Sequence, residues 1–166
     1  RYLIYQAVFS PQPQAPTEEW LSGLALVEYV IQKRNNKFPD PARYPNSGSV
    51  LIHPYVPKYS AAYEKAISLG IPCHEGRNGC KIPTGAVLEK LGFKGKDFGN
   101  GIALSKQHAN FLVRYGDAKL VDWLSAVRQM RHAVDESLGL APEVEPTLLG
   151  TCPEGHPEIR CCPATA

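Results

Sequence analysis

The longest helical pattern in the chain lies between Asp117 and Leu138. Its apolar residues recur every three or four positions and would form one buried face, with Asp117 as the N-cap and Gly139 as the helix end. Shorter helices are predicted at 17–33, 61–69 and 85–91. Short strands are predicted at 2–9, 50–52, 102–104, 111–113 and 147–149. Because these elements show no regular strand–helix–strand alternation, the sequence favours an α+β fold in which a small mixed sheet packs with helices.

Composition limits the functions open to such a chain. The 166 residues are 43% hydrophobic and 20% charged, with a net charge of +2, which predicts a globular domain and argues against a nucleic-acid partner. No apolar run is long enough to span a membrane. Residues 1–150 are expected to form the domain and residues 151–166 a loosely packed tail containing cysteine and proline. The chain begins with Arg1 next to a strand-like segment, so we expect a piece of a longer or processed polypeptide.

Five cysteines leave several bonding states open. They are Cys73, Cys80, Cys152, Cys161 and Cys162. An odd number cannot all pair within one copy of the chain. Cys73 and Cys80 flank a Gly-rich loop and could form a local disulfide, whereas free thiols in a reducing compartment are the simpler expectation. Cys152, His156, Cys161 and Cys162 resemble a zinc set, but no pair has the C-x-x-C spacing that structural zinc sites use.

Residues 46–54, NSGSVLIHP, carry the best candidate for a functional site. They place a small-residue turn and the hydroxyl of Ser49 directly before a short apolar strand. Lys37 lies upstream in 37–41 (KFPDP), and Glu145 follows far downstream. A hydroxyl, an amine and a carboxylate at strand and loop ends could form a site for an anionic substrate. No phosphate-cradling glycine loop and no dinucleotide fingerprint accompanies them.

Five separated motifs resemble those of a known family. Residues 37–41 resemble its K-L-P-D-P, and residues 46–54 resemble N-A-G-S-F-F-K-N-P. Residues 81–95, which begin KIPTG, resemble two further motifs that start K-I-P-A-G and end G-L-K-G, and residues 103–109 (ALSKQHA) resemble A-V-S-E-K-H-A. Over about residues 1–150 the chain is similar to the C-terminal half of UDP-N-acetylenolpyruvoylglucosamine reductase, the flavoenzyme family MurB of peptidoglycan synthesis.

The resemblance implies a domain that binds UDP-N-acetylglucosamine enolpyruvate. In the family, a reduced flavin delivers a hydride to the enolpyruvyl double bond and a serine protonates the neighbouring carbon. The matching serine here is Ser49, and Glu145 matches the carboxylic residue that helps to stabilise the enol-like intermediate. Lys37, His53 and His108 fall at positions that contact substrate in the family. The resemblance therefore implies two catalytic residues and three substrate-binding residues.

The chain also departs from the family pattern. Ile52 and His53 stand where the family has lysine and asparagine, and Ala86 replaces a tryptophan. The flavin-binding half, with its catalytic arginine, has no counterpart in the sequence. FAD and NADPH are therefore expected only through a missing N-terminal domain. The chain alone is expected to bind no cofactor and no metal, and not to turn over.

Two interpretations of function stay open on the sequence. In the first, the chain is the substrate-binding domain of a reductase whose flavin domain comes from the same gene or from a partner. In the second, a MurB-derived domain now serves as a non-catalytic structural or binding subunit of a larger complex. A reductase of this family belongs in the bacterial cytoplasm, or in a plastid if the host is eukaryotic, and the sequence does not choose between these locations.

Overall fold

The computed structural model describes residues 24–76 and 79–162, and the chain divides into two units, residues 1–33 and 34–166. The strand predicted at 2–9 and the start of the helix predicted at 17–33 lie outside the described residues. That helix, α1 (Leu24–Lys37), ends four residues later than predicted. Arg34 and Lys37 occupy its last turn, where positive charge stabilises a helix, and Pro39 then prevents further extension.

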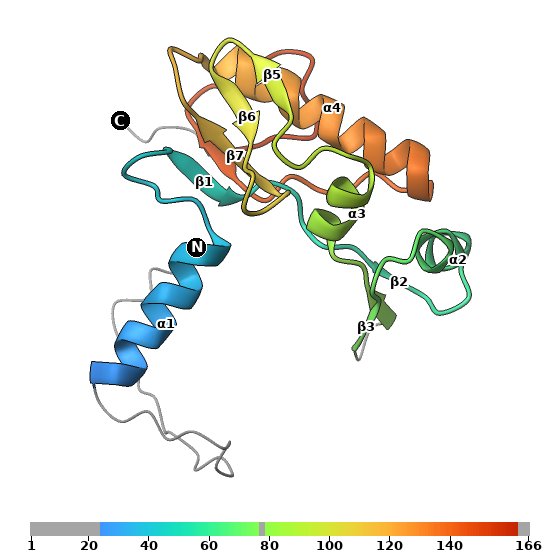
Figure 1. The fold of residues 1–166 in the computed structure, drawn as a ribbon. Coiled ribbons are helices and arrows are strands. Elements are labelled where there is room, and N and C mark those ends of the chain that lie inside the picture. Colours follow the sequence, from blue (N-terminus) through green and yellow to red (C-terminus); the bar gives the residue numbers. More distant parts are fainter. Residues whose placement is uncertain (1–23, 77–78, 163–166) are drawn as a thin grey trace. The chain divides into compact units, whose positions relative to one another are not determined.

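The second unit contains a four-stranded antiparallel sheet with the strand order β1-β7-β6-β5. Its strands are β1 (Asn46–Ser49), β5 (Asp97–Gly99), β6 (Ile102–Leu104) and β7 (Phe111–Arg114). The long helix α4 (Leu120–Leu138) packs against β5 and β6, as Figure 1 shows. The strands predicted at 102–104 and 111–113 are thereby confirmed, and so is the α+β class.

A smaller antiparallel sheet of three strands, in the order β2-β4-β3, belongs to the same unit. Its strands are β2 (Tyr55–Val56), β3 (His74–Gly76) and β4 (Gly79–Lys81). Helices α2 (Ala61–Ser68) and α3 (Thr84–Lys90) each contact α4. Ser60 caps α2 as predicted, because its hydroxyl accepts a hydrogen bond from the backbone N–H of Tyr63.

The face of α4 that the sequence predicted to be buried forms the centre of the hydrophobic core. The buried residues of the helix are Leu124, Ala126, Val127, Met130, Val134 and Leu138. Leu120, which the same spacing placed on this face, is exposed because it lies at the start of the helix. Gly139 ends the helix in the left-handed conformation, as predicted. The N-cap prediction was wrong: α4 begins after Lys119, whose backbone N–H donates to the Asp122 carboxylate at 2.8 Å. A carboxylate inside the first turn satisfies the free N–H here, so Asp117 is not needed as a cap.

The strand predicted at 50–52 lies earlier in the chain than expected. Strand β1 ends at Ser49, and the following apolar residues contribute only one isolated antiparallel bridge, between Leu51 and Val144. Val50 and Leu51 are completely buried, so their apolar character reflects their place in the core rather than membership of a regular strand. Ser49 therefore lies at the end of a strand, where the chain leaves the sheet.

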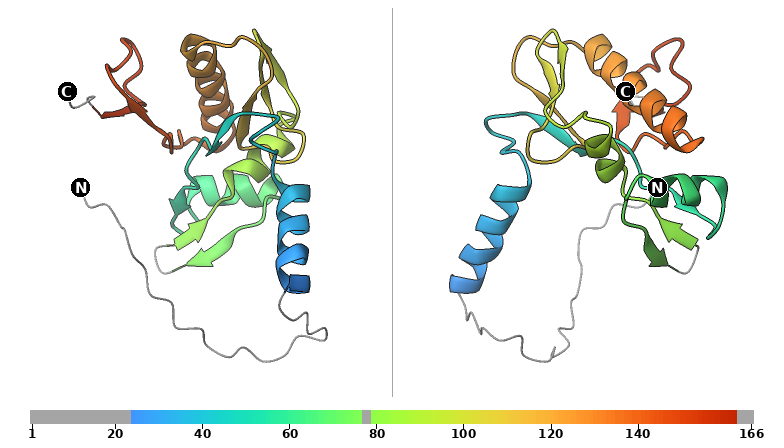
Figure 2. Two further views of the ribbon diagram at one scale, coloured as in Figure 1. Left: turned by 90° about the vertical axis from the view of Figure 1, so that its left-hand side faces the viewer. Right: turned by 45° about the vertical axis from the view of Figure 1, so that its right-hand side comes forward.

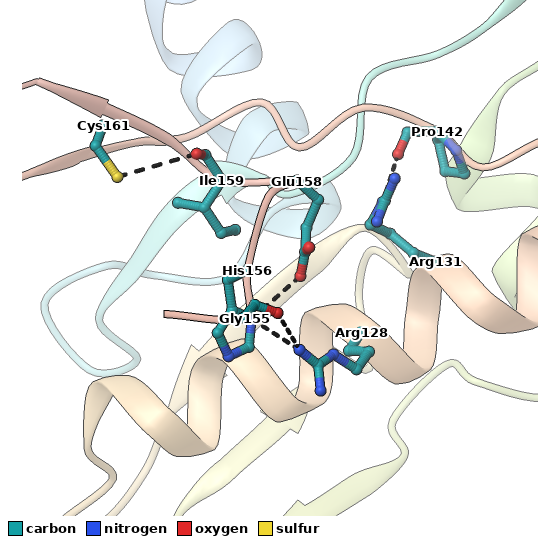
Figure 3. Close-up of polar contacts among 8 residues, drawn as sticks. All are labelled: Arg128, Arg131, Pro142, Gly155, His156, Glu158, Ile159 and Cys161. Carbon is teal, nitrogen blue, oxygen red and sulfur yellow. Dashed lines mark hydrogen bonds and ion pairs between the residues drawn. The ribbon is translucent and has the colours of Figure 1, made fainter. Parts of the chain in front are cut away.

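The C-terminal segment packs on the domain as far as residue 162, whereas the sequence suggested a loosely packed tail. Strand β9 (Arg160–Cys162) pairs in parallel with β8 (Thr147–Leu149), and Ile159 joins the hydrophobic core. A guanidinium N–H of Arg128 on α4 donates to the carbonyl of Gly155 at 2.7 Å (Figure 3). Figure 2 shows this segment beside α4. The domain boundary at residue 150 stays a prediction.

Four of the five cysteines form disulfides in the structure. Cys73 pairs with Cys80, and Cys152 pairs with Cys161, whereas Cys162 is free. The local bridge between Cys73 and Cys80 is the alternative that the sequence left open, and the expectation of free thiols was wrong for these four. Within residues 24–76 and 79–162, no group of three or more histidine, cysteine or acidic residues could hold a metal ion. Nor is any helix in that part of the chain long and apolar enough to cross a membrane.

Candidate functional site

The structure brings the backbone at Glu145 beside the backbone that follows Ser49. The N–H of Glu145 donates to the carbonyl of Val50 at 2.8 Å, and the N–H of Ile52 donates to the carbonyl of Glu143, also at 2.8 Å. Ser49 is half-buried and Glu145 is exposed. The two residues that the sequence assigned as catalytic are far apart along the chain, yet these two hydrogen bonds hold their segments together. Their catalytic roles stay predictions.

His53 lies at the end of the same segment and has a fixed tautomer. The N–H of Thr84 donates to its Nδ1 at 3.1 Å, so in the neutral ring the proton is on Nε2. The hydroxyl of Thr84 donates to the carbonyl of Ile52 at 3.0 Å. Burial lowers the pKa of His53, and the nearby charge of Lys81 lowers it further, against an opposing effect of Glu145. His53 in its neutral form thus carries its N–H on Nε2, from which it can donate a hydrogen bond.

His108 has the same arrangement. Its Nδ1 accepts a hydrogen bond from the N–H of Asn110 at 3.3 Å, which again leaves the proton of the neutral ring on Nε2. Burial lowers the pKa of His108, and the charge of Lys37 and the neighbouring His53 lower it further. Its ring stacks on Phe38, with ring centres 5.6 Å apart, and meets the edge of Phe111 at 4.8 Å. Packing therefore fixes both the position and the tautomer of this imidazole.

Lys37 supplies the positive charge of the site. It is the last residue of α1 and is exposed, and its Nζ lies 5.5 Å from the ring centre of Phe38. Phe38 in turn stacks on His108, so the ammonium group and the two histidines share one neighbourhood. A hollow of about 450 Å³ adjoins these residues and is lined by Arg34, Phe38, Asn46, Gly48 and Phe111, among others. Lys37, His53 and His108 thus lie near one another, and the charge of Glu145 acts on His53. Ser49 ends β1 opposite Phe111, whose ring contacts His108.

Two buried polar residues at the site were not selected from the sequence. Thr84 and Asn110 are both completely buried, and their side chains hydrogen-bond the backbone of Ile52 and Leu51. A signal was present, because each is a small polar residue next to apolar residues of a motif, KIPTG or HANF. Such residues are buried only when their polar groups have partners. The partners themselves come from distant parts of the chain and cannot be read from the motif.

The lowered pKa values of His53 and His108 should make the stability of the domain depend on pH. Because the folded pKa of each is lowered below the ordinary value of 6.5, the unfolded chain binds protons first as the pH falls. Stability should therefore be full above pH 6.5, fall as the pH drops below it, and level off below the folded pKa values. A double replacement, His53→Asn and His108→Asn, keeps a side-chain acceptor and should flatten this dependence. Urea unfolding midpoints between pH 5 and 8 measure the effect; an unchanged slope in the double variant contradicts it.

The backbone near the start of α3 leaves no room for a cofactor phosphate beside Gly85. Gly85 is the glycine at the start of α3, where a cofactor phosphate would require open space beside the backbone. A Cβ placed on Gly85 would lie 3.2 Å from Cε1 of His108, so the imidazole fills the space that the glycine leaves. The space beside Gly85 is therefore not open to a cofactor, and the described residues supply a candidate site for an anionic ligand.

Fold and site together define an α+β domain in which an ammonium, two imidazoles and a carboxylate lie near one another, with Ser49 at the end of strand β1. Residues 40–149 match the family described as UDP-N-acetylenolpyruvoylglucosamine reductase, C-terminal domain, and the chain belongs to that family.

Curated relatives carry the same description. The chain is 32% identical over 127 residues to UDP-N-acetylenolpyruvoylglucosamine reductase of Xylella fastidiosa, which covers 75% of the chain and 36% of the relative. It is 30% identical over 133 residues to the reductase of Pseudoalteromonas translucida, and this match covers 80% of the chain and 39% of the relative. It is 32% identical over 133 residues to the reductase of Xanthomonas axonopodis pv. citri, and this match covers 78% of the chain and 38% of the relative. The chain thus spans less than two fifths of the length of these relatives.

Proposed function

We propose that the chain is the substrate-binding domain of a MurB-type reductase, that it binds UDP-N-acetylglucosamine enolpyruvate, and that Ser49 donates the proton in the reduction. The observation that carries this proposal is the hydrogen bond from the Glu145 N–H to the Val50 carbonyl. It holds the segment of the proposed acidic residue against the segment of the proposed proton donor.

The surrounding groups suit an anionic ligand. Lys37 can form a charge-assisted hydrogen bond with a phosphate or carboxylate oxygen. His53 and His108, held as Nε2–H tautomers, can each donate one hydrogen bond to an oxygen of the ligand. His53 therefore supplies a donor where the family has an asparagine, and this departure from the family pattern is chemically compatible with substrate binding. Ile52 supplies no such group.

Ser49 would act as a general acid. A free serine hydroxyl is a very weak acid, so it must be held against the carbon that accepts the proton and be supported electrostatically. Its place at the end of β1, half-buried and next to the completely buried Val50, restricts its movement. Glu145 would stabilise the enol-like intermediate from the neighbouring segment.

The reaction would need a second segment of protein. FAD and NADPH would be bound by a flavin-binding domain, in the same polypeptide or in a partner. The chain alone would bind substrate without reducing it. A bacterial cytoplasmic or a plastid location is part of the same proposal.

Replacing Lys37 with alanine tests substrate binding directly. Loss of one charge-assisted hydrogen bond, at about 1.5–3 kcal/mol, should weaken binding of UDP-N-acetylglucosamine enolpyruvate roughly 10- to 100-fold. Isothermal titration calorimetry on the chain measures this change. The matched control is Lys65→Ala on α2, which removes an exposed lysine of the second unit and should leave the affinity unchanged. Equal weakening by both changes would show that only the net charge matters.

The same titration separates the two functional interpretations. Saturable binding by the wild-type chain that Lys37→Ala weakens supports a substrate-binding domain. No binding by the wild-type chain overturns the proposed function and favours a non-catalytic structural or binding subunit of a larger complex. The apolar Ile52 at a position where the family has lysine is the feature of the site that favours this alternative.

A further inference from the structure

We propose that Asn110 is the positioning residue of the candidate site, because its side chain holds the segment that joins Ser49 to His53. The assignment of this segment as a substrate site rests on the proposed function, but the positioning role rests only on the contacts of Asn110.

The side chain of Asn110 pairs with the backbone of Leu51 as a neighbouring strand would. The N–H of Leu51 donates to Oδ1 of Asn110 at 3.0 Å, and Nδ2 of Asn110 donates to the Leu51 carbonyl at 2.8 Å. A single amide side chain thus satisfies both backbone groups of one residue, as a neighbouring strand does. Leu51 and Asn110 both have no exposed surface, so no water is available to replace these bonds.

The backbone of Asn110 extends the same connection to other site residues. Its carbonyl accepts a hydrogen bond from the N–H of Val50 at 2.9 Å, and its N–H donates to Nδ1 of His108 at 3.3 Å. On the opposite side, the carbonyl of Val50 accepts the N–H of Glu145. Asn110 is therefore one or two hydrogen bonds away from the segments of Ser49, Glu145, His53 and His108.

The chemistry of the contact requires an amide. Leu51 presents one donor and one acceptor, and an asparagine side chain supplies the complementary acceptor and donor in one plane. An ionised carboxylate of the same shape accepts but cannot donate, and it would oppose the Leu51 carbonyl. A protonated carboxylic acid, in contrast, has one O–H donor and one acceptor and restores both contacts.

This difference makes Asn110→Asp a test with a pH signature. The introduced carboxyl should have a raised pKa because it is buried. Below that pKa the variant should match the wild-type chain, and above it the backbone N–H groups of Ile52 and Glu145 should exchange with solvent roughly 10- to 100-fold faster, as expected for loss of a buried hydrogen bond. Amide exchange by NMR, expressed as the ratio of variant to wild type at each pH, measures this change. His108 contacts Asn110, and its charged neighbours are Lys37, His53, Glu89 and Lys94. These groups are present in both chains, so dividing the two exchange rates cancels the effect that their titration has on both.

Two further variants separate positioning from general destabilisation. Asn110→Ala removes both contacts and should speed exchange at Ile52 and Glu145 at every pH; if it does not fold, Asn110→Asp below its carboxyl pKa still decides the matter. Val134→Ala destabilises the core from α4, far along the chain from this contact, and should speed exchange throughout the domain without singling out these two residues. A ratio independent of pH in Asn110→Asp, or the same local loss in Val134→Ala, would overturn the positioning role.

Titration with UDP-N-acetylglucosamine enolpyruvate distinguishes failure of this proposal from failure of the proposed function. If the exchange results hold and the wild-type chain does not bind, the positioning role stands and the substrate assignment fails. If the wild-type chain binds and the affinity of Asn110→Asp relative to wild type does not change with pH, the substrate assignment stands and the positioning role fails.

Discussion

Replacing Met130 with alanine should lower the free energy of unfolding by about 2–5 kcal/mol, the cost of removing a large side chain from a close-packed core. Met130 has no exposed surface and lies on the buried face of α4 between Val127 and Val134. Its neighbours belong to an ordered core and can fill the space only in part. Chemical denaturation followed by circular dichroism measures the change.

A matched control lies on the same helix. Gln129→Ala removes an exposed side chain one residue away and should change stability by about 0.5 kcal/mol or less. If Met130→Ala costs less than about 1 kcal/mol, then α4 is not the centre of the core. Because α4 contacts β5, β6, α2 and α3, its packing decides whether the sheet and the site retain their arrangement.

Replacing Gly101 with alanine should cost about 2–4 kcal/mol, the sum of a left-handed backbone and a steric clash. Gly101 precedes β6 with a φ of +83°, a conformation that favours glycine. A Cβ there would lie 2.8 Å from Cα and 2.9 Å from N of Gly116. These are backbone atoms, which cannot move aside as the end of a long side chain can.

Gly116 provides the control on the other side of the same contact. A Cβ on Gly116 would lie 3.2 Å from Cα of Gly101, and the φ of Gly116 is not positive. Gly116→Ala should therefore destabilise the domain clearly less than Gly101→Ala. Thermal unfolding of the two variants under identical conditions compares them, and equal losses would show that the backbone conformation of Gly101 contributes little.

The site depends on backbone hydrogen bonds more than on contacts between its own side chains. Ser49 and Glu145 are brought together through Val50, and His53 and His108 are fixed through the N–H groups of Thr84 and Asn110. Positions that determine the site's geometry therefore include residues that would never touch a ligand. A substitution at Thr84 or Asn110 should alter the site even though each side chain is completely buried.

The C-terminal segment has a direct connection to the same region. Arg160 forms an ion pair with Glu143, whose carbonyl accepts the N–H of Ile52. Arg131 on α4 donates to the carbonyl of Pro142 at 2.8 Å, as Figure 3 shows. The strand pair β8–β9 follows Glu145 directly. Residues beyond the family match at 40–149 therefore contribute to holding the segment that carries Glu145.

Much of the local structure followed from the sequence. The periodicity of apolar residues predicted α4 to Leu138 and its buried face, and Ser60 and Gly139 marked helix ends correctly. Prediction failed where a residue other than the expected one supplied a hydrogen-bond partner. Asp122 replaced Asp117 as the partner of the first turn of α4, and the Asn110 side chain replaced a strand beside Leu51. In both cases the backbone groups needed partners, and the sequence pattern did not show which residue supplied them.

By itself, the sequence determined the α+β class, the main helices and the family to which the five candidate site residues point, because these depend on local periodicity and on motifs of fixed spacing. Only the tertiary structure decided that Ser49 ends a strand, that the segments of Ser49 and Glu145 are joined by a hydrogen bond, and that both imidazoles carry their neutral proton on Nε2. The physical reason is that buried backbone groups and side chains must find hydrogen-bond partners, and in a folded chain these partners come from residues far away in sequence.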